Sequence, residues 1–505
     1  MSANSDNLPR HRTPVQQAGL LIGPLVALLL ATGPRWGLVL EPSQPMLNPM
    51  AAVAAWMAIW WISEALPLAA TALLPLVLFP LLKIPPGHQI ALRYGHPLLF
   101  LFLGGFLLAI AIEQSGLHRR FALSIVAAVG DNPRRITLGF MLATASLSMW
   151  LSNTATTLMV LPIALSVLSQ APSSGSDEAR TRQFGVALLL AVAYSASIGG
   201  IATLIGTPPN VAFKAIFEDY FPGEPAITFG GWMVFAFPFS AALLAVAWWL
   251  LTFVVFAVDA RPLLGGSEVV RQQLFDLGPM RPAERRMLTI FVATAVLWIL
   301  REPVASWGWA PWLGLDRLDD GTVLADDGTV AIGMALLCFI VPSGGATGGP
   351  LLTWDAARRL PWGILLLFGG GMALAQGLES TGLDAYLGRW LAARLGGLSQ
   401  LGIIAAVTAG TTFFTELTSN LASVNMLLPV LAGTSEQLGL DPRLLMIPAT
   451  LAASCAFMLP VATPPNAIVY GSGRIRTGEM VRAGLLLNIA GILLTVLLMA
   501  VIQAW

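Results

Sequence analysis

Charged residues are scarce in this chain. Of its 505 residues, 11% are charged and 56% are hydrophobic, and the formal net charge is zero. This composition is not that of a soluble enzyme, because long apolar stretches recur from one end of the chain to the other. The balanced charge gives no sign of a nucleic-acid partner, and we expect none. The composition predicts a protein that lies in the lipid bilayer.

Cysteine and histidine are also rare. The two cysteines, Cys338 and Cys455, both fall in apolar segments, so a disulfide has little support. The HExxH and GxSxG motifs are absent, and no paired aspartates occur in an apolar segment. The four histidines precede the first polar triplet and lie near predicted surfaces: His11, His88, His96 and His118. These absences argue against an intramembrane enzyme, and we expect no enzymatic activity.

Long apolar stretches predict the fold class. A helix needs about 20 apolar residues to cross a bilayer. Two stretches, 136–167 and 400–432, are too long for one crossing and carry polar triplets near their midpoints, so we interpret each as a re-entrant hairpin. Eleven other stretches predict transmembrane helices: 16–33, 48–65, 67–83, 97–115, 184–203, 230–257, 286–300, 329–343, 361–379, 443–461 and 482–503. The expected fold is an all-α polytopic membrane protein with about eleven transmembrane helices and two hairpins.

The two hairpins belong to an internal repeat. The segment from Leu101 to Leu117 matches the segment from Leu367 to Leu383 without a gap, at an offset of 266 residues. The hairpin triplets repeat at nearly the same offset, so helix and hairpin were duplicated together. Five predicted crossings separate the copies, and an odd number predicts inverted repeats. The expected division is an N-terminal segment with the first helix, a first repeat and a second repeat: 1–45, 46–258 and 259–505.

The basic residues indicate the orientation. Arginine and lysine are about twice as frequent in the predicted inner segments as in the outer ones if the N-terminus is cytoplasmic, which is the positive-inside bias. We therefore expect a multi-pass plasma-membrane protein whose C-terminus lies outside. A cleaved signal peptide is the alternative for the first apolar segment, but a retained helix keeps the later inner segments in phase. Short amphipathic pieces near 118–130 and 384–397 are expected at the membrane interface.

Each repeat carries the same two polar interruptions. The hairpin triplets are Ser152-Asn153-Thr154 and Ser419-Asn420-Leu421, and each is followed by Thr-Pro-Pro-Asn, beginning at Thr207 and at Thr463. A helix broken within the bilayer leaves backbone groups that need a polar partner. The N-terminus of a half-helix attracts an anion, and free carbonyls coordinate a hard cation such as Na⁺. One such motif alone is usually a kink or a packing detail, but its duplication in the same order favours a binding site.

An acidic residue, Glu416, precedes the second triplet. A carboxylate at membrane depth is costly unless it has a function or partners. It therefore either carries a coupling charge or is satisfied within its own hairpin.

The paired hairpin triplets and Thr-Pro-Pro-Asn breaks resemble those of the divalent anion:sodium symporter family, which includes dicarboxylate, citrate and sulfate carriers. The resemblance extends from about Trp60 to the end of the chain. It implies a homodimer in which a scaffold domain makes the dimer contact and a transport domain moves the substrate by an elevator mechanism. It also implies two sodium sites, one in each repeat, with sodium as a coupling ion rather than a prosthetic group.

The resemblance also assigns residues by motif position. The implied first sodium site consists of Ser148, Ser152, Asn153 and Gly206, and the second of Thr415, Thr418, Asn420 and Ala462. The substrate carboxylates would meet Asn153, Thr154, Thr207, Asn420, Leu421, Thr463 and Pro464.

Leu421 departs from the family pattern, because it stands where a second threonine or another small residue is usual. Loss of a hydroxyl donor weakens carboxylate binding by about 1 kcal/mol or more. Either Ser423 or the backbone replaces this donor, or the substrate is not the usual four-carbon dicarboxylate.

These features lead to a functional hypothesis. We expect a secondary active transporter that moves a small divalent anion inward with sodium, with succinate, malate or fumarate as the favoured substrates. A sodium-independent dicarboxylate exchanger is the nearest alternative, followed by a sulfate or citrate transporter.

Overall fold

The computed structural model describes residues 12–130, 132–169, 178–261, 266–302, 308–318, 323–344 and 348–504. The regular secondary structure of these residues is helical, and within them the only extended pairings are two isolated bridges, Arg317 with Val323 and Pro342 with Pro350. The expectation of an all-α fold is therefore confirmed. Residues 1–11, at the start of the expected N-terminal segment, lie outside the described ranges.

Within the described residues, eight helices precede the first hairpin: α1 (Pro14–Thr32), η1 (Gly33–Trp36), α2 (Leu47–Ser63), α3 (Leu68–Thr71), α4 (Leu74–Leu82), η2 (Gly87–Gly95), α5 (Pro97–Ser115) and α6 (Leu117–Val129). The first hairpin and the helices after it are α7 (Pro133–Ser148), α8 (Asn153–Ser169), α9 (Glu178–Ile201), α10 (Pro208–Tyr220), α11 (Phe229–Trp249) and the π-helix η4 (Leu250–Val255).

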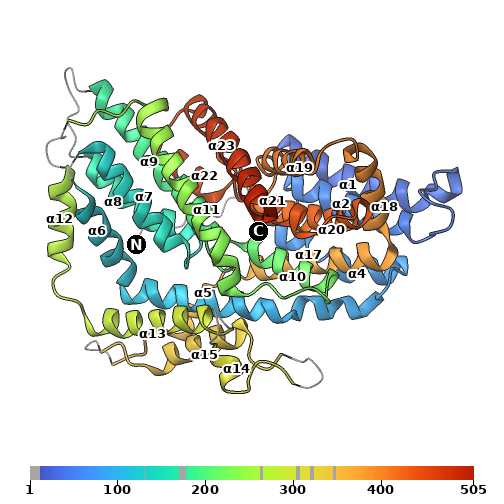
Figure 1. Ribbon diagram of the computed structural model, residues 1–505, viewed down its shortest axis with the longest axis horizontal. Helices are drawn as coiled ribbons and strands as arrows, with labels where there is room; N and C mark the ends of the chain where they lie inside the picture. The colour runs from blue at the N-terminus through green and yellow to red at the C-terminus, as the bar shows by residue number, and fades with distance from the viewer. Residues whose placement is uncertain are drawn as a thin grey trace.

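The remaining described helices are α12 (Gly266–Asp276), α13 (Pro282–Ile299), α14 (Trp309–Trp312), α15 (Asp327–Ile340), α16 (Trp354–Ala357), α17 (Trp362–Thr381), α18 (Leu383–Leu395), α19 (Gln400–Thr415), α20 (Asn420–Leu438), α21 (Arg443–Ala453), α22 (Pro464–Tyr470) and α23 (Thr477–Ala504). In Figure 1 the hairpin of α7 and α8 lies in the left half of the molecule, and that of α19 and α20 lies in the right half.

Six spans in the described part of the chain are long and apolar enough to cross a membrane: Pro14–Trp36, Gly87–Ser115, Glu178–Ile201, Phe229–Val255, Trp362–Thr381 and Thr477–Gln503. A seventh arises if the bent pair α18 and α19 counts as one span. Each of the eleven predicted stretches contains a helix, but several of these helices are shorter than a full crossing.

Two of the predicted helices differ from the structure. The stretch 67–83 is interrupted between α3 and α4, where Pro75 stands in the first turn of α4. Proline lacks the N–H that would continue the hydrogen-bond ladder. The stretch 443–461 ends as a helix at Ala453, and residues 454–463 form an irregular break.

Matching glycines end the corresponding helices α5 and α17 of the two repeats. Gly116 and Gly382, at φ 80° and 74°, stand between α5 and α6 and between α17 and α18. This left-handed conformation suits glycine because it has no Cβ. The amphipathic pieces predicted near 118–130 and 384–397 follow these turns as α6 and α18.

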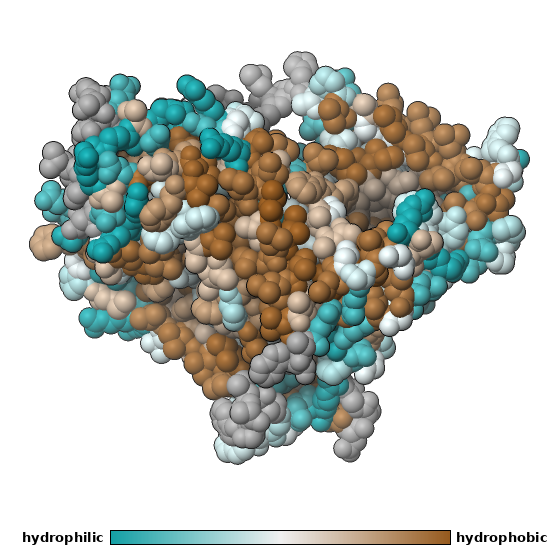
Figure 2. All heavy atoms as spheres, turned by 45° about the horizontal axis from the view of Figure 1, so that its top comes forward, coloured by the Kyte–Doolittle hydropathy of each residue, from teal (hydrophilic) through white to brown (hydrophobic). Residues whose placement is uncertain are grey.

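The apolar window of α9 is entirely buried inside the protein, whereas only 17% of the window of α1 and 28% of that of α23 are buried. Small residues bring the first hairpin close to α9, since a methyl group added at Gly199 would lie 2.3 Å from the carbonyl oxygen of Ala145 on α7. Figure 2 shows apolar residues gathered over the middle of one face, with hydrophilic residues toward the left end and the lower right. The exposed apolar surface fits a lipid environment.

Candidate functional site

The first hairpin turns at a polar tip between Ser148 and Asn153. The Ser148 hydroxyl donates to Asn153 Oδ1 at 2.7 Å, and Ser152 Oγ accepts from the N–H of Ala155 at 3.2 Å. Ser148 is fully buried, whereas the triplet from Ser152 to Thr154 is partly exposed. Three of the predicted sodium ligands therefore lie at one turn, beside the N-terminus of α8.

The first break separates α9 from α10. The side-chain amide of Asn210 donates to the carbonyls of Gly200, Ile201 and Thr203, at 3.2, 3.2 and 2.8 Å. Thr207 precedes α10 in an extended conformation, and its hydroxyl does not cap that helix. Asn210 thus binds the carbonyls at the C-terminal end of α9. Thr207 is buried and directly precedes α10.

Gly200 joins this break to the first tip. A methyl group at Gly200 would lie 2.5 Å from Asn153 Oδ1 and 3.0 Å from the carbonyl oxygen of Gly206. Only a residue without a side chain fits between these two oxygens. The structure therefore brings Ser148, Asn153 and Gly206 together, as the first predicted sodium site requires.

The second tip has the same construction. Thr415 ends α19, and its hydroxyl lies 3.1 Å from Asn420 Oδ1 and 3.0 Å from the carbonyl oxygen of Ala453. Ser419 is the N-cap of α20, and its hydroxyl oxygen accepts a hydrogen bond from a backbone N–H of this helix. The hydroxyl of Thr418 is buried and has no hydrogen-bond partner among the described residues.

The second break separates α21 from α22. The amide of Asn466 donates to the carbonyls of Ala456 and Leu459, both at 3.1 Å, as Asn210 does in the first half. Thr463 Oγ1 accepts from the N–H of Asn466 at 3.3 Å. Both Thr-Pro-Pro-Asn motifs therefore use the asparagine to tie down the end of the preceding helix.

The two halves interlock through the helices that follow the breaks. α22 packs against α8 and α9, and α10 packs against α17 and α20. In Figure 1, α22 accordingly lies among the helices of the first half, and α10 lies beside those of the second. Each break is thereby followed by a helix that contacts the hairpin of the other half. At the second break Ala462 is buried and Pro464 is exposed.

Both halves contain buried oxygen atoms that have no hydrogen-bond partner among the described residues. Among the described residues, Oδ1 of Asn210 and of Asn466 is buried without a hydrogen-bond donor, as are the hydroxyls of Thr156 and Ser454. Buried polar atoms are rarely left without a partner. No group of three or more His, Cys, Asp or Glu that could hold a metal occurs in these ranges. Hydroxyl and carbonyl oxygens suit a hard monovalent cation better than a transition metal.

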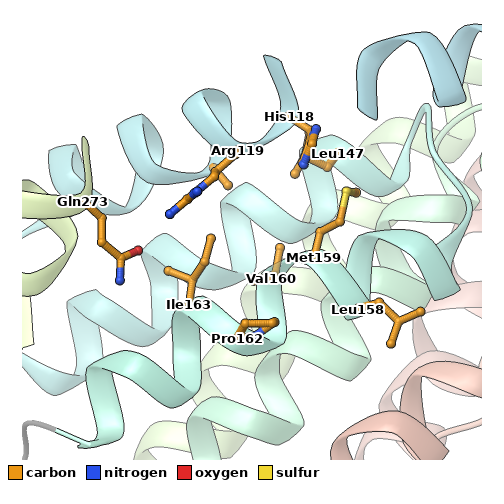
Figure 3. Close-up of a pocket in the computed structure, with 10 residues that line it drawn as sticks. His118, Arg119, Leu147, Leu158, Met159, Val160, Pro162, Ile163 and Gln273 are labelled. Carbon is orange, nitrogen blue, oxygen red and sulfur yellow. The ribbon is translucent and has the colours of Figure 1, made fainter. Parts of the chain in front are cut away.

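A cavity of about 360 Å³ lies beside the first hairpin, between α6, α8 and α12. Figure 3 shows its polar lining, with His118 and Arg119 on one side and Gln273 on the other. Apolar side chains of α8, among them Met159 and Ile163, form the remaining wall. No predicted site residue lines this cavity, so it is separate from the tips and breaks.

Known proteins share this architecture. Residues 40–505 match the family described as the sodium:sulfate symporter transmembrane region. The chain belongs to this family. The resemblance of its motifs to the divalent anion:sodium symporters is therefore confirmed.

Two relatives and one solved structure extend the comparison. The sodium-dependent dicarboxylate transporters SdcS of Staphylococcus aureus strains NCTC 8325 and USA300 are each 40% identical over 488 residues, which cover 95% of this chain and 90% of the relative. The crystal structure of the YdaH transporter of Alcanivorax borkumensis matches with a TM-score of 0.56 at 16% identity, over 83% of this chain and 88% of that one. The latter likeness shows a shared fold.

The substituted position of this symporter family member, Leu421, is buried in the first turn of α20. Ser423 is also fully buried, and its hydroxyl donates to the carbonyl of Ser419 at 3.1 Å. Its hydrogen is therefore used inside the helix. The structure gives no support to the suggestion that Ser423 replaces the missing donor.

The sequence predicts either a coupling charge at Glu416 or contacts within its own hairpin, and the structure shows a third arrangement. Its carboxylate is buried and accepts from the backbone N–H groups of Phe457, Met458 and Leu459 and from the amide of Asn488 on α23. It is satisfied by the second break and not within its own hairpin. The sequence signal was the acidic residue in an apolar hairpin, but its partners follow only from the fold.

Proposed function

We propose that this protein is a secondary active transporter that couples sodium to the inward movement of a C4-dicarboxylate such as succinate, malate or fumarate. The observation that carries the proposal is the repeated oxygen cluster at the broken helices. In each hairpin a hydroxyl, that of Ser148 or that of Thr415, donates a hydrogen bond to the asparagine at which the second helix begins. The name of the SdcS relatives, at 40% identity, supports a dicarboxylate substrate and sodium coupling.

The proposed sodium sites use oxygens of both hairpins and breaks. The first consists of Ser148, Ser152, Asn153 and Gly206, and the second of Thr415, Thr418, Asn420 and Ala462. Gly206 and Ala462 would contribute backbone carbonyls. The proposed substrate residues are Asn153, Thr154, Thr207, Asn420, Leu421, Thr463 and Pro464. Sodium bound beside these residues neutralises part of the anion's charge, so each ligand raises the affinity of the other.

The proposed membrane arrangement has eleven crossings, with two re-entrant hairpins from opposite faces, and a cytoplasmic N-terminus in the plasma membrane. The inverted repeats span 46–258 and 259–505, and the protein works as a homodimer by an elevator movement. The duplicated hairpins and the positive-inside bias support this topology. Labelling of single cysteines introduced at Lys83 and Arg261 with a membrane-impermeant thiol reagent tests it, with Lys83 reactive from outside and Arg261 protected. Reaction of both positions from the same side would refute the topology.

Uptake of labelled succinate by proteoliposomes tests the function. An inward sodium gradient is expected to drive accumulation, whereas a potassium gradient does not. Uptake without sodium that is stimulated by internal dicarboxylate would identify an exchanger instead. Competition by unlabelled succinate, sulfate and citrate identifies the substrate class.

Two substitutions test the site. Asn153→Ala and Asn420→Ala are each expected to abolish sodium-driven uptake, because each removes the side chain shared by a sodium site and the substrate site. Gln400→Ala is the control, since this exposed amide lies at the far end of α19 from the tip. Normal uptake by either asparagine variant would refute the assignment.

A further inference from the structure

The two breaks differ in length. The Thr-Pro-Pro-Asn motifs are 256 residues apart, so Ile201, the last residue of α9, corresponds to Phe457. In the second half the helix α21 has already ended at Ala453. Residues 454–457 are therefore unwound, although their counterparts 198–201 are helical.

Unwinding leaves backbone N–H groups without a partner inside the helix, and Glu416 accepts hydrogen bonds from them. Its Oε1 accepts from the N–H groups of Phe457 and Met458 at 2.7 and 2.9 Å, and its Oε2 accepts from that of Leu459 at 3.0 Å. The side-chain amide of Asn488 adds a fourth donor at 2.8 Å. All four partners are donors, which is the pattern of an ionised carboxylate, since that group only accepts.

The first half has no equivalent acceptor. Met149 occupies the position of Glu416, and its thioether sulfur is only a weak hydrogen-bond acceptor, whereas a carboxylate offers two strong acceptor oxygens. There the backbone provides the acceptor instead, since the N–H of Ala202 donates to the carbonyl of Gly199. The longer break thus occurs in the half that has the carboxylate.

The carboxylate is linked to the second proposed sodium site through Leu459. The N–H of this residue donates to Glu416, and its carbonyl accepts from the amide of Asn466 and from the N–H of Ala462, at 3.1 and 3.2 Å. Glu416 also directly follows Thr415, whose hydroxyl meets Asn420. Displacement of Leu459 would move the chain that leads to Ala462.

We propose that Glu416 is a positioning residue that holds the second break unwound and thereby shapes the second sodium site. It need not touch the ion, because it acts through the backbone of 457–459. This inference rests on the proposed sodium coupling. It predicts that the sodium requirement depends on a contact that the first half lacks.

The first test replaces Glu416 with glutamine, which keeps its size but presents an NH₂ group to a backbone donor. Glu416→Gln is expected to raise the sodium concentration for half-maximal succinate uptake by about tenfold, the effect of one lost charge-assisted hydrogen bond. The KM for succinate at saturating sodium is expected to change much less. Glu113→Gln, which removes an exposed carboxylate on α5, is the matched control and should leave both constants unchanged. An unchanged sodium requirement in Glu416→Gln, or an equal change in the KM for succinate, would overturn the inference.

A milder variant serves if Glu416→Gln does not fold. Asn488→Ala removes one donor from the carboxylate and leaves its three backbone contacts in place. It is expected to raise the sodium requirement in the same direction by about two- to threefold. No change in sodium requirement would count against the inference.

Hydrogen exchange of the purified protein gives a readout that does not need transport. In Glu416→Gln the amides of 457–459 are expected to exchange faster, while those of 201–203 keep the wild-type rate. Unchanged exchange at 457–459 would overturn the positioning role. If uptake by the wild-type protein does not depend on sodium, the proposed function fails. The hydrogen-exchange rates still decide whether Glu416 stabilises the unwound break.

Discussion

In each half a hydrogen bond joins the same position of the tip to the same position of the break. The side chain that makes this bond comes from the break in one half and from the tip in the other. In the first half the side chain comes from the break, since the hydroxyl of Thr203 donates to the carbonyl of Met149 in the tip. In the second half the side chain comes from the tip, since Glu416 accepts from the N–H of Leu459 in the break. The duplicated geometry is therefore maintained by different chemistry in each copy.

The environments of the tips differ as well. Trp150 in the first tip stacks on Trp298 and Phe229, with centroids 6.3 and 6.2 Å apart, and meets the edge of Phe291 at 5.1 Å. Its counterpart in the second tip, Leu417, is 65% exposed. The first tip is thus docked against α11 and α13, whereas the second tip depends on polar contacts with its own break.

Among the substitutions that compare the two halves, the largest expected effect concerns the space between tip and break. Gly200→Ala places a methyl group 2.5 Å from Asn153 Oδ1 and so displaces this side chain from the first proposed sodium site. A misplacement of about 1 Å at a functional centre can cost about 100-fold in rate, and we expect a loss of uptake of that order. The measurement is initial succinate uptake under a sodium gradient.

The second half supplies the control for this substitution. Its counterpart of Gly200 is Ala456, which is fully buried and already carries a methyl group. Ala456→Gly is expected to retain most of the uptake. Equal loss in both variants would mean that the two halves are not packed differently at this position.

The next effect concerns the stability of the first tip. Trp150→Ala removes a partly buried ring from three aromatic neighbours, and we expect it to lower the free energy of unfolding by about 2 kcal/mol. Leu417→Ala, at the exposed counterpart, is expected to change it by less than about 0.5 kcal/mol. Thermal denaturation of the purified variants in detergent compares them. A larger loss in Leu417→Ala would show that the second tip, and not the first, is the docked one.

Much of this arrangement could be predicted from the sequence because it rests on local signals. Both hairpins appear where polar triplets interrupt apolar stretches, and their second helices begin at Asn153 and Asn420. Proline pairs after Thr207 and Thr463 place the helix starts, since proline fits the first turn of a helix but not its interior.

The early end of α21 was not predicted, because it depends on a contact between distant residues. The stretch 443–461 is mostly apolar and predicts one helix, yet Glu416, in the turn after α19, accepts hydrogen bonds from its unwound end and is itself held by Asn488 on α23. Hydropathy reports the environment of a residue and does not show where its backbone hydrogen bonds are made. The interlocking of α10 and α22 with the opposite hairpins is likewise a product of the tertiary fold.

A smaller effect is expected from the contact between tip and break in the first half. Thr203→Val keeps the shape of the side chain but removes the hydrogen bond to the carbonyl of Met149 and the acceptor for the N–H of Gly206. We expect a loss of about 1–2 kcal/mol in stability and a higher sodium requirement for uptake. Thr203→Ser, which keeps the hydroxyl, is the control. If valine and serine behave alike, the hydroxyl does not hold the tip.

The smallest effect concerns the one position where the triplets differ. Leu421→Thr gives the second triplet the sequence of the first, in which Thr154 is partly exposed at the tip. If the dicarboxylate lies between the two tips, the added hydroxyl is expected to lower the KM for succinate about fivefold, which corresponds to about 1 kcal/mol. Leu421→Val is the matched control, because valine has the shape of threonine without the hydroxyl. A gain with threonine but not with valine assigns the effect to hydrogen bonding, whereas equal gains assign it to the space that leucine occupies, and no gain in either places the substrate away from Leu421.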